Sequence, residues 1–390
     1  MQYIQLIEYQ TQSFPAETFS SDEIQTLWEN HRPVLHIDPP SFQNDFCWVM
    51  TPQGWVGHIP LSAEKTIVIQ PKVPVQNLFG MLKQVYRLPS FKFIDGLTRV
   101  ETLEGMLDLL AFELASRVHD RLRQGIFQTY LKKREPISVV RGRVDSRWLA
   151  THPADSQIQC DFTEQTADVP FNQVLAYTLR LIAVGGACSK ETMRIVNKAW
   201  RQMPVTMLTF QSIDLADWGY SRLNADYRPM HALCRLFLDV LQPKHQPDQI
   251  GHHMLPFLVN MPVLYEKYVA SWLGQNLPAG YSLREQERVD LDTNESRYVD
   301  LDLIIFDAVN NPVIVLDTKY KAGEPTNDDI YQVTFYAREI GCRSAGLVYP
   351  IRPNTPLSGR NQEITYRAYT FALDHNSNEA GAAFLKQLDL

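Results

Sequence analysis

Two apolar runs with charged residues at their ends decide the fold of the carboxy-terminal third, in the stretch Val299-Asp-Leu-Asp-Leu-Ile-Ile-Phe-Asp-Ala-Val-Asn-Asn-Pro-Val-Ile-Val-Leu-Asp-Thr-Lys319. The runs predict neighbouring strands, because the turn formers Asn310-Asn311-Pro312 separate them. Asp302 opens the first run and Asp317 ends the second. In a hairpin of this length the two carboxylates can lie side by side. Lys319, two residues after Asp317, projects to the same face.

Two carboxylates and a lysine in this arrangement suit a divalent-cation site. Mg²⁺ prefers carboxylate oxygens and retained waters, and Mn²⁺ is the alternative ion. A nearby ammonium can orient or deprotonate an attacking water and offset charge that develops on a scissile phosphate. Glu266, on a preceding predicted helix, is a candidate accessory acid. An Asp-x-Lys sequence alone more often forms a salt bridge at a strand end, so the prediction depends on the combination of residues.

The elements around this hairpin are predicted in the order α-β-β-β-α-β. They are helix 263–273, strands 281–289, 298–306 and 313–316, helix 328–340 and strand 344–349. Together with the two acids and the lysine, this order resembles the core of the PD-(D/E)xK nucleases.

The whole chain is predicted to be an α+β protein with two further parts before this region. Residues 1–100 are β-rich, with short or alternating apolar runs and one capped helix near residue 20. Residues 101–250 are mainly helical, and the longest helical pattern extends from about Leu103 to Leu131. The polar, turn-rich segment 243–253 marks the main boundary, so the nuclease-like domain is expected at residues 251–390.

Residues 132–147 form the densest positive stretch of the sequence, with six basic side chains against two acidic ones. The basic residues are Lys132, Lys133, Arg134, Arg141, Arg143 and Arg147. Two interpretations are open: a solvated loop with an edge strand, or a surface that binds phosphate or a partner.

The overall composition excludes several classes of protein. At 390 residues, with 45% hydrophobic and 21% charged residues, the chain is a globular protein of two or three domains. Its net charge of −7 means that any contact with DNA must come from a local basic face. No apolar run approaches the roughly 18 residues of a membrane span. The amino terminus alternates like a strand, and the five scattered cysteines suit a reducing compartment, so a cytoplasmic location is expected.

Several segments together resemble the McrC family, the nuclease subunit of the McrBC modification-dependent restriction systems. They are Val68-Ile-Gln-Pro-Lys72, Asn77-Leu-Phe-Gly-Met-Leu82, Arg141-Gly-Arg143, Asp168-Val-Pro-Phe-Asn172, Leu264-Tyr-Glu-Lys-Tyr-Val269, Asp302-Leu-Ile-Ile305, Asp317-Thr-Lys-Tyr-Lys321 and Asp329-Ile-Tyr-Gln-Val-Thr-Phe-Tyr-Ala337. The resemblance implies a carboxy-terminal endonuclease domain and a region, residues 1–250, that docks on a ring-forming AAA+ GTPase.

The resemblance also extends the set of candidate site residues. The usual proline before the first acid is replaced here, so Asp300 is an alternative to Asp302 as first acid. Gln332 matches the family's helical glutamine, which suggests an accessory role in orienting the lysine or contacting phosphate. Lys321 and Tyr336 are expected to contact DNA. The sequence contains no G-x-x-x-x-G-K-[ST], so a partner and not this chain is expected to bind nucleotide.

These observations predict a Mg²⁺-dependent endonuclease that cleaves modified double-stranded DNA with an McrB-like GTPase ring and stimulates that ring. Asp302 and Asp317 would hold the metal and Lys319 would act on the water. Two alternatives are a non-catalytic subunit that assembles or activates an NTPase ring, and a nuclease that works with an ATP-dependent helicase.

Overall fold

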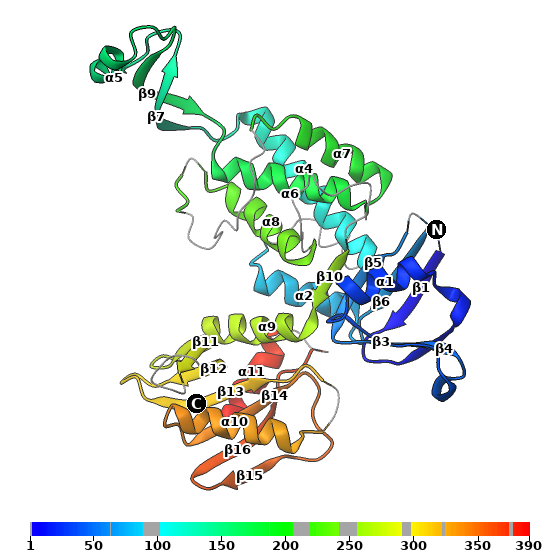
Figure 1. Ribbon diagram of the computed structural model, residues 1–390. Coiled ribbons are helices and arrows are strands. Elements are labelled where there is room, and N and C mark those ends of the chain that lie inside the picture. Colours follow the sequence, from blue (N-terminus) through cyan, green and yellow to red (C-terminus); the bar gives the residue numbers. More distant parts are fainter. Residues whose placement is uncertain are drawn as a thin grey trace. The chain divides into compact units, whose positions relative to one another are not determined.

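The chain divides into two compact units in the computed structural model (Figure 1). The structure describes residues 2–62, 64–88, 102–186, 188–205, 219–222, 224–241, 256–290, 298–321, 324–373 and 377–390. Residues 1–106 and 256–390 form one unit, here called the terminal unit because it contains both ends of the chain. Residues 107–255 form the middle unit. The predicted boundary segment 243–253 lies outside the described residues, and the predicted division at residues 100 and 250 stays a prediction.

The first part of the terminal unit is β-rich, as predicted. Its strands are β1 (Gln2–Ile7), β2 (Gln12–Pro15), β3 (Leu35–Asp38), β4 (Cys47–Pro52), β5 (Trp55–Pro60) and β6 (Lys65–Gln70), and its helices are α1 (Ser21–Asn30), α2 (Val75–Val85) and the short 3-10 helices η1 (Ala16–Thr18) and η2 (Phe42–Asn44). The predicted helix near residue 20 is confirmed as α1, because Ser20 and Glu23 form a reciprocal capping box at its start.

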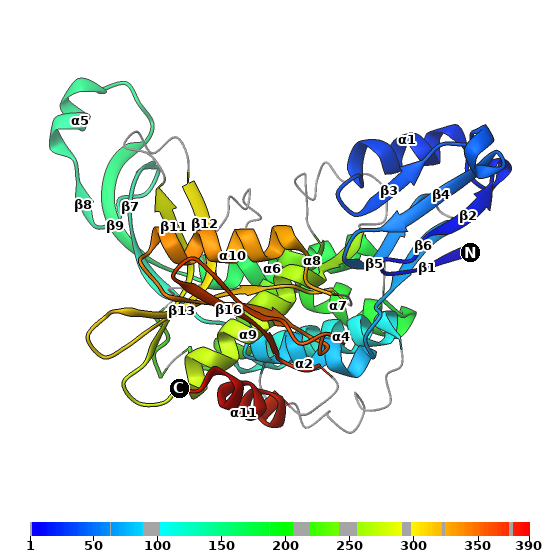
Figure 2. The ribbon, with the colours of Figure 1, turned by 90° about the horizontal axis from the view of Figure 1, so that it is seen from below.

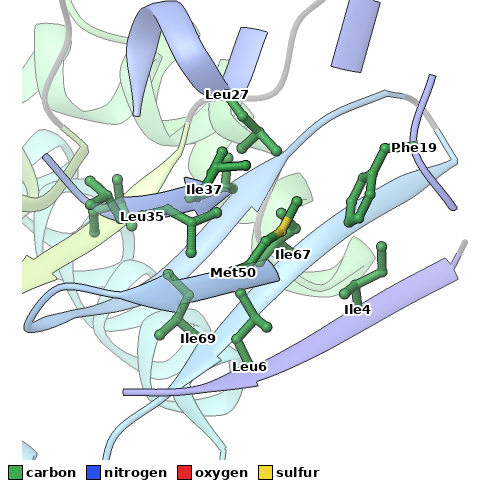
Figure 3. Packing of buried hydrophobic residues seen from close by; sticks show 12 residues of the cluster. Ile4, Leu6, Phe19, Leu27, Leu35, Ile37, Met50, Ile67 and Ile69 are labelled. Carbon is green, nitrogen blue, oxygen red and sulfur yellow. The ribbon is translucent and has the colours of Figure 1, made fainter. Parts of the chain in front are cut away.

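One apolar core holds this part together (Figure 3). Alternate residues of strands from two sheets point into it, as expected when one face of each sheet is buried. Ile4 and Leu6 of β1, Ile67 and Ile69 of β6 and Met50 of β4 meet Leu27 of α1 there.

A strand from far along the chain completes the larger of these two sheets. Its order is β1-β6-β5-β10, and β10 (Phe257–Asn260) pairs antiparallel with β5. Gly57 of β5 has φ +139°, and a side chain there would collide with the carbonyl of Phe257, so glycine permits the close approach of these two strands. The chain therefore returns to its first sheet before it enters the carboxy-terminal region.

The middle unit is mainly helical, with one small sheet. Beginning with the helix that leads into the unit, its elements are α4 (Leu103–Gln124), β7 (Thr129–Ile137), β8 (Arg143–Val144), α5 (Ser146–Thr151), β9 (Ile158–Thr166), α6 (Pro170–Gly185), α7 (Lys190–Arg201) and α8 (Tyr227–Leu241). The helical pattern predicted to continue to Leu131 is wrong at its end. The helix stops before Gly125, which has φ +103°, and Leu131 is an exposed residue of β7.

The carboxy-terminal region contains a six-stranded mixed sheet of order β11-β12-β13-β14-β16-β15. Its elements are α9 (Met261–Asn276), β11 (Ser282–Asp290), β12 (Tyr298–Phe306), β13 (Pro312–Thr318), α10 (Asn327–Glu339), β14 (Ser344–Tyr349), β15 (Ser358–Asn361), β16 (Ile364–Thr370) and α11 (Ser377–Leu388). The predicted order α-β-β-β-α-β is confirmed from α9 to β14.

Helices cover both faces of this sheet (Figure 2). Val333 and Ala337 of α10 share an apolar cluster with Val315 of β13 and with Ala368 of β16. The next residue of β16, Tyr369, faces the other way and contacts Phe384 of α11. Among the described residues, none of the helices combines the length and the apolar character that crossing a bilayer requires.

Candidate functional site

The two predicted aspartates lie at adjacent positions on β12 and β13. The antiparallel ladder pairs Leu303 with Leu316, so the next positions along the two strands are Asp302 and Asp317. One Asp302 carboxylate oxygen accepts hydrogen bonds from the backbone N–H and the hydroxyl of Thr318, at 2.8 and 3.1 Å. The Asp-Thr-Lys sequence therefore supplies one acid of the site and also holds the other in place.

The carboxylates of this site lie in one region, where Asp317 is buried and Asp302 and Glu266 are half-buried. Burial raises the pKa of Asp317 to about 7, and the neighbouring Asp302 carboxylate adds to the shift. The pKa of Asp302 is also raised by burial, against the opposing hydrogen bonds from Thr318. The pKa of Glu266 on α9 is raised by burial and then by Asp302. Three acids with raised pKa values in one region are typical of a functional site rather than of a stabilising salt bridge.

Lys319 lies within this group of acids. Its Nζ is 2.8 Å from Oδ2 of Asp317, 2.9 Å from Oε1 of Gln332 and 3.9 Å from Oδ1 of Asp329. Burial lowers the pKa of Lys319, but the attraction of Asp317 and Asp329 outweighs it, so the pKa is raised and the side chain is an ammonium ion. The Gln332 amide donates in turn to the hydroxyl of Tyr336, at 2.8 Å. The structure thus brings the lysine, the glutamine and the tyrosine into one hydrogen-bonded chain.

Two other candidates have contacts of their own. The Asp300 carboxylate is exposed and pairs with Arg288, whose Nε is 3.1 Å away. Lys321 pairs with Asp329 at 2.5 Å. Asp300 is thus engaged in a surface ion pair, whereas Asp302 is engaged by the strand that carries Asp317 and Lys319.

Three residues of the site were missed by the sequence analysis. Besides Thr318, these are Asp329, which contacts both Lys319 and Lys321, and Gln286, which donates to Glu266 at 3.2 Å. The signal for Asp329 was readable, because Thr326 and Asp329 have the spacing of a capping box, and the structure contains one at the start of α10. The role of Gln286 had no sequence signal. Its φ of +48° marks a local irregularity in β11 at the position opposite Asp302.

The donor set of the site fits Mg²⁺. This ion commonly takes one or two protein carboxylates and keeps several waters, and Asp302 and Asp317 supply two adjacent carboxylates. Oδ2 of Asp317 is buried and receives no hydrogen bond of acceptable geometry, although Lys319 Nζ is 2.8 Å away. A cation beside this oxygen would complete its coordination. Within the described ranges, three or more His, Cys, Asp or Glu side chains nowhere converge on one point, so the fit depends on the aspartate pair.

The predicted basic surface lies in the middle unit, around β7, β8 and the start of α5. Lys133 and Arg141 pair with Glu164, at 2.6 and 3.6 Å, and Arg134 pairs with Asp145 and Asp161. The other three basic residues are Lys132, Arg143 and Arg147. None of these three forms an ion pair within the described part of the chain. Half of the basic stretch is therefore neutralised locally, and its role as a partner or phosphate surface stays a prediction.

The fold and the site together define a class of proteins of mixed α and β structure that carry paired acids on adjacent strands of a mixed sheet and a lysine just after the second strand. The chain belongs to the McrBC family: residues 50–350 match the family described as McrBC 5-methylcytosine restriction system component. The predicted family is thereby confirmed. No curated protein matches the chain.

Two solved structures from Thermococcus gammatolerans are similar to the chain. One is a refined half-complex from a tetradecameric assembly of McrB AAA+ hexamers with bound McrC. The match has 15% identity and a TM-score of 0.60, and it covers 100% of this chain and 99% of that chain. It shows a shared fold. The other is a cryo-EM structure of the McrBC complex, with 14% identity, a TM-score of 0.46, and coverage of 73% of this chain and 90% of that chain.

Proposed function

We propose that the chain is the endonuclease subunit of an McrBC-like, nucleotide-dependent restriction system that cleaves modified double-stranded DNA. Membership of a family described by a 5-methylcytosine restriction system supports the restriction role. The observation that carries the nuclease assignment is the close grouping of Asp302 on β12, the buried Asp317 near the end of β13, and Lys319 just after that strand. The region that holds it would then be a PD-(D/E)xK domain.

In the proposed reaction, Asp302 and Asp317 hold the divalent cation, with Glu266 as an accessory acid. Mg²⁺, when bound, supplies Lewis-acid activation of water and of the scissile phosphate. Lys319 Nζ positions the attacking water and offsets the negative charge that develops on the phosphate. Its ammonium is held for this task by Asp317 and Gln332.

Residues at the edge of the site would position the DNA. Tyr336 is hydrogen-bonded to Gln332, and Lys321 follows the catalytic strand, so both could contact the phosphate backbone. Lys321 would have to exchange its ion pair with Asp329 for a phosphate. Binding of DNA by Lys321 would therefore leave Lys319 as the remaining lysine beside Asp329.

The partner in this proposal is an McrB-like AAA+ GTPase ring. The fold shared over the whole chain with a structure of McrB AAA+ hexamers with bound McrC supports it. This chain lacks a phosphate-binding P-loop sequence, so the partner would bind the nucleotide. Residues 1–250 would dock on the ring and stimulate its hydrolysis, and the carboxy-terminal region would cut.

A cleavage assay with an McrB-like ring protein as the partner tests the proposal. Plasmid DNA with and without 5-methylcytosine is incubated with both proteins, Mg²⁺ and GTP, ATP or a non-hydrolysable nucleotide. We expect GTP-dependent cleavage of the methylated plasmid, and a loss of about 100-fold or more in the Lys319→Met variant. Lys386→Met is the matched control, because Lys386 is an exposed residue of α11.

Each other outcome rejects part of the proposal. Cleavage with ATP alone would mean that an ATP-dependent motor is the partner. Stimulated hydrolysis by the ring without any DNA cleavage, in Mg²⁺ or Mn²⁺, would identify a non-catalytic activator. Equal cleavage by wild type and Lys319→Met would show that the site lies elsewhere.

A further inference from the structure

A buried polar group links the first sheet of the terminal unit to the segment after β13 that carries Lys319. Glu8 directly follows β1, and Lys72 lies two residues after the end of β6. The two strands are parallel neighbours that pair Ile7 with Gln70, so Glu8 and Lys72 lie at the same end of the sheet. Tyr320, the third member of the group, directly follows Lys319.

These three residues are joined by direct contacts. One carboxylate oxygen of Glu8 accepts hydrogen bonds from the backbone N–H of Lys72 and from the hydroxyl of Tyr320, both at 3.3 Å. Nζ of Lys72 donates to the backbone carbonyl of Tyr320 at 3.4 Å. The same ammonium lies 4.1 Å from the ring centroid of Tyr320 and 4.6 Å from that of Tyr9. Residues more than 240 positions apart in sequence are therefore fixed to one another.

The group is buried at some energetic expense. Glu8 is 1% exposed and Tyr320 is 4% exposed. The second carboxylate oxygen of Glu8 has no hydrogen-bond partner among the described residues. Burial raises the pKa of Glu8 against the attraction of Lys72, and burial lowers the pKa of Lys72 against the attraction of Glu8. Apolar residues of similar volume would often be as stable in such a place, so this pair calls for an explanation beyond stability.

The position of Tyr320 suggests that explanation. The backbone on either side of it carries Lys319, whose N–H donates to Val348 of β14, and Lys321, whose N–H donates to Lys319. The ring of Tyr320 also packs against Tyr265 of α9, at 5.9 Å between centroids, and Tyr265 precedes Glu266. Tyr320 is thus the sequence neighbour of Lys319 and also contacts the sequence neighbour of Glu266.

We infer that Glu8, Lys72 and Tyr320 are positioning residues, which hold the backbone around Lys319 in place and make its geometry depend on the first sheet. The inference rests on the proposed nuclease function. It adds that a rearrangement of the first sheet, for example when the ring docks, would displace the backbone around Lys319 through the contact of Lys72 with the carbonyl of Tyr320. The coupling would let the docking part of the chain control the catalytic lysine without touching DNA.

Hydrogen exchange and cleavage kinetics of the full chain test this inference. Lys72→Met keeps the apolar stem and removes the ammonium, and Lys72→Arg restores a donor. We expect the amides of residues 319–321 to exchange about tenfold faster or more in Lys72→Met. We also expect kcat for cleavage with the partner to fall about 10- to 100-fold at unchanged KM for DNA, because small displacements of a catalytic group cost that much. The arginine variant should recover part of both losses.

Lys65→Met is the matched control. Lys65 lies at the other end of β6, pairs with the buried Glu23 at 2.8 Å and lies 5.7 Å from the ring centroid of Phe19. It therefore resembles Lys72 in its contacts but does not touch Tyr320. We expect exchange at residues 319–321 and kcat to stay at wild-type values in this variant. Tyr320→Phe, which removes only one hydroxyl, is the second test if Lys72→Met does not fold.

The outcomes separate the inference from the proposed function. Unchanged exchange at residues 319–321 in Lys72→Met, or the same acceleration in Lys65→Met, would overturn the inference. If wild-type protein and partner cleave no DNA, the proposed function fails. The exchange measurement on the chain alone then still decides whether Lys72 holds this backbone.

Discussion

Polar side chains are buried both in the carboxy-terminal sheet and in the middle unit, but their hydrogen bonding differs. In the middle unit, Asn172 and Tyr227 are fully buried, and the tyrosine hydroxyl donates to the asparagine at 2.8 Å. The hydroxyl also accepts from the N–H of Phe127, and the Asn172 amide donates to the carbonyls of Phe127 and Ala167. Each of these groups has a partner, as is usual for a buried network that stabilises a fold.

In the candidate site, Asp302 accepts from Thr318 and Glu266 accepts from Gln286, but Asp317 is poorly satisfied. Oδ2 of Asp317 receives no hydrogen bond of acceptable geometry, and its pKa is raised to about 7 by burial and by Asp302. Surroundings that disfavour the ionised form of a carboxylate lower the stability of the fold. Such surroundings persist where function requires them. The comparison teaches that burial alone does not identify a functional group, whereas a buried carboxylate with a raised pKa beside a second acid is a candidate for one.

The largest expected effect comes from Asp317→Asn. Cleavage should fall on the order of 1,000-fold, because a ligand of the cation is lost. The metal-free protein should nevertheless melt higher than wild type at pH 8. The pKa of Asp317 in the folded state, about 7, exceeds the ordinary 3.8, so its favourable contribution exists at low pH and is lost as pH rises through 7.

Melting curves of both proteins in EDTA at pH 5 and pH 8 check this reversal. We expect a gain on the order of 3 °C or more at pH 8 and a smaller one at pH 5. A variant that melts lower at both pH values would show that the ionised acid stabilises the fold, and the contrast with the middle unit would be lost.

Asn172→Ala should do the opposite: it should lower the stability of the fold and leave the candidate site unaffected. It removes the acceptor of the Tyr227 hydroxyl proton and the donor to the carbonyls of Phe127 and Ala167, so the free energy of unfolding should fall by about 3 kcal/mol. Urea denaturation at pH 7 measures this loss. Titration calorimetry of the metal-free protein with Mn²⁺ should give the same cation affinity for the variant as for wild type. Weakened cation binding would mean that the network also serves the site.

The pH dependence of the middle unit should arise in part from His231. This buried ring contacts the carbonyl of Phe171 at 2.9 Å and the hydroxyl of Tyr220 at 3.0 Å, and burial lowers its pKa to about 4. Since the ordinary pKa is 6.5, its contribution to stability is complete above that value and is lost as pH falls towards 4. Between pH 7 and pH 5, wild type should lose about 2 kcal/mol more than His231→Gln. Equal losses in urea denaturation would show that the ring is not the group that titrates.

The smallest effect is expected from Asp300→Asn. Its carboxylate is exposed and engaged in a surface ion pair with Arg288, and such pairs contribute little, so cleavage should change less than about fivefold. Asp302→Asn in the same assay should cost about 100-fold. The reverse order of effects would make Asp300 the first acid of the site.

Much of the carboxy-terminal region could be predicted because its signals are local. The apolar runs of β12 and β13 specify their strands, and the parity of Asp317 and Lys319 follows from the two-residue period of a strand. Local signals also led to one error. Leu131 continues a helical spacing, but the helix ends before Gly125. Leu131 instead belongs to β7, which pairs with β9 about 30 residues further along the chain.

The remaining contacts depend on the tertiary structure. Thr318 binds Asp302 only because the register of the hairpin places them together, and the contact of Glu8 with Tyr320 joins residues 312 positions apart. The bulged position of Gln286 has no pattern in the sequence that marks it. Such contacts follow from packing and register, which the sequence specifies only through the complete fold.

The return of β10 to the first sheet sets a condition on synthesis. The edge of β5 stays unpaired until residues 257–260 have left the ribosome, about 200 residues after β5 itself. At roughly 5–20 residues per second, the nascent chain carries an open sheet edge for about 10–40 s. A fragment that ends at residue 250 keeps that edge open permanently. Truncations intended to isolate the proposed ring-docking part should therefore end after Asn260, or supply the missing strand as a separate peptide.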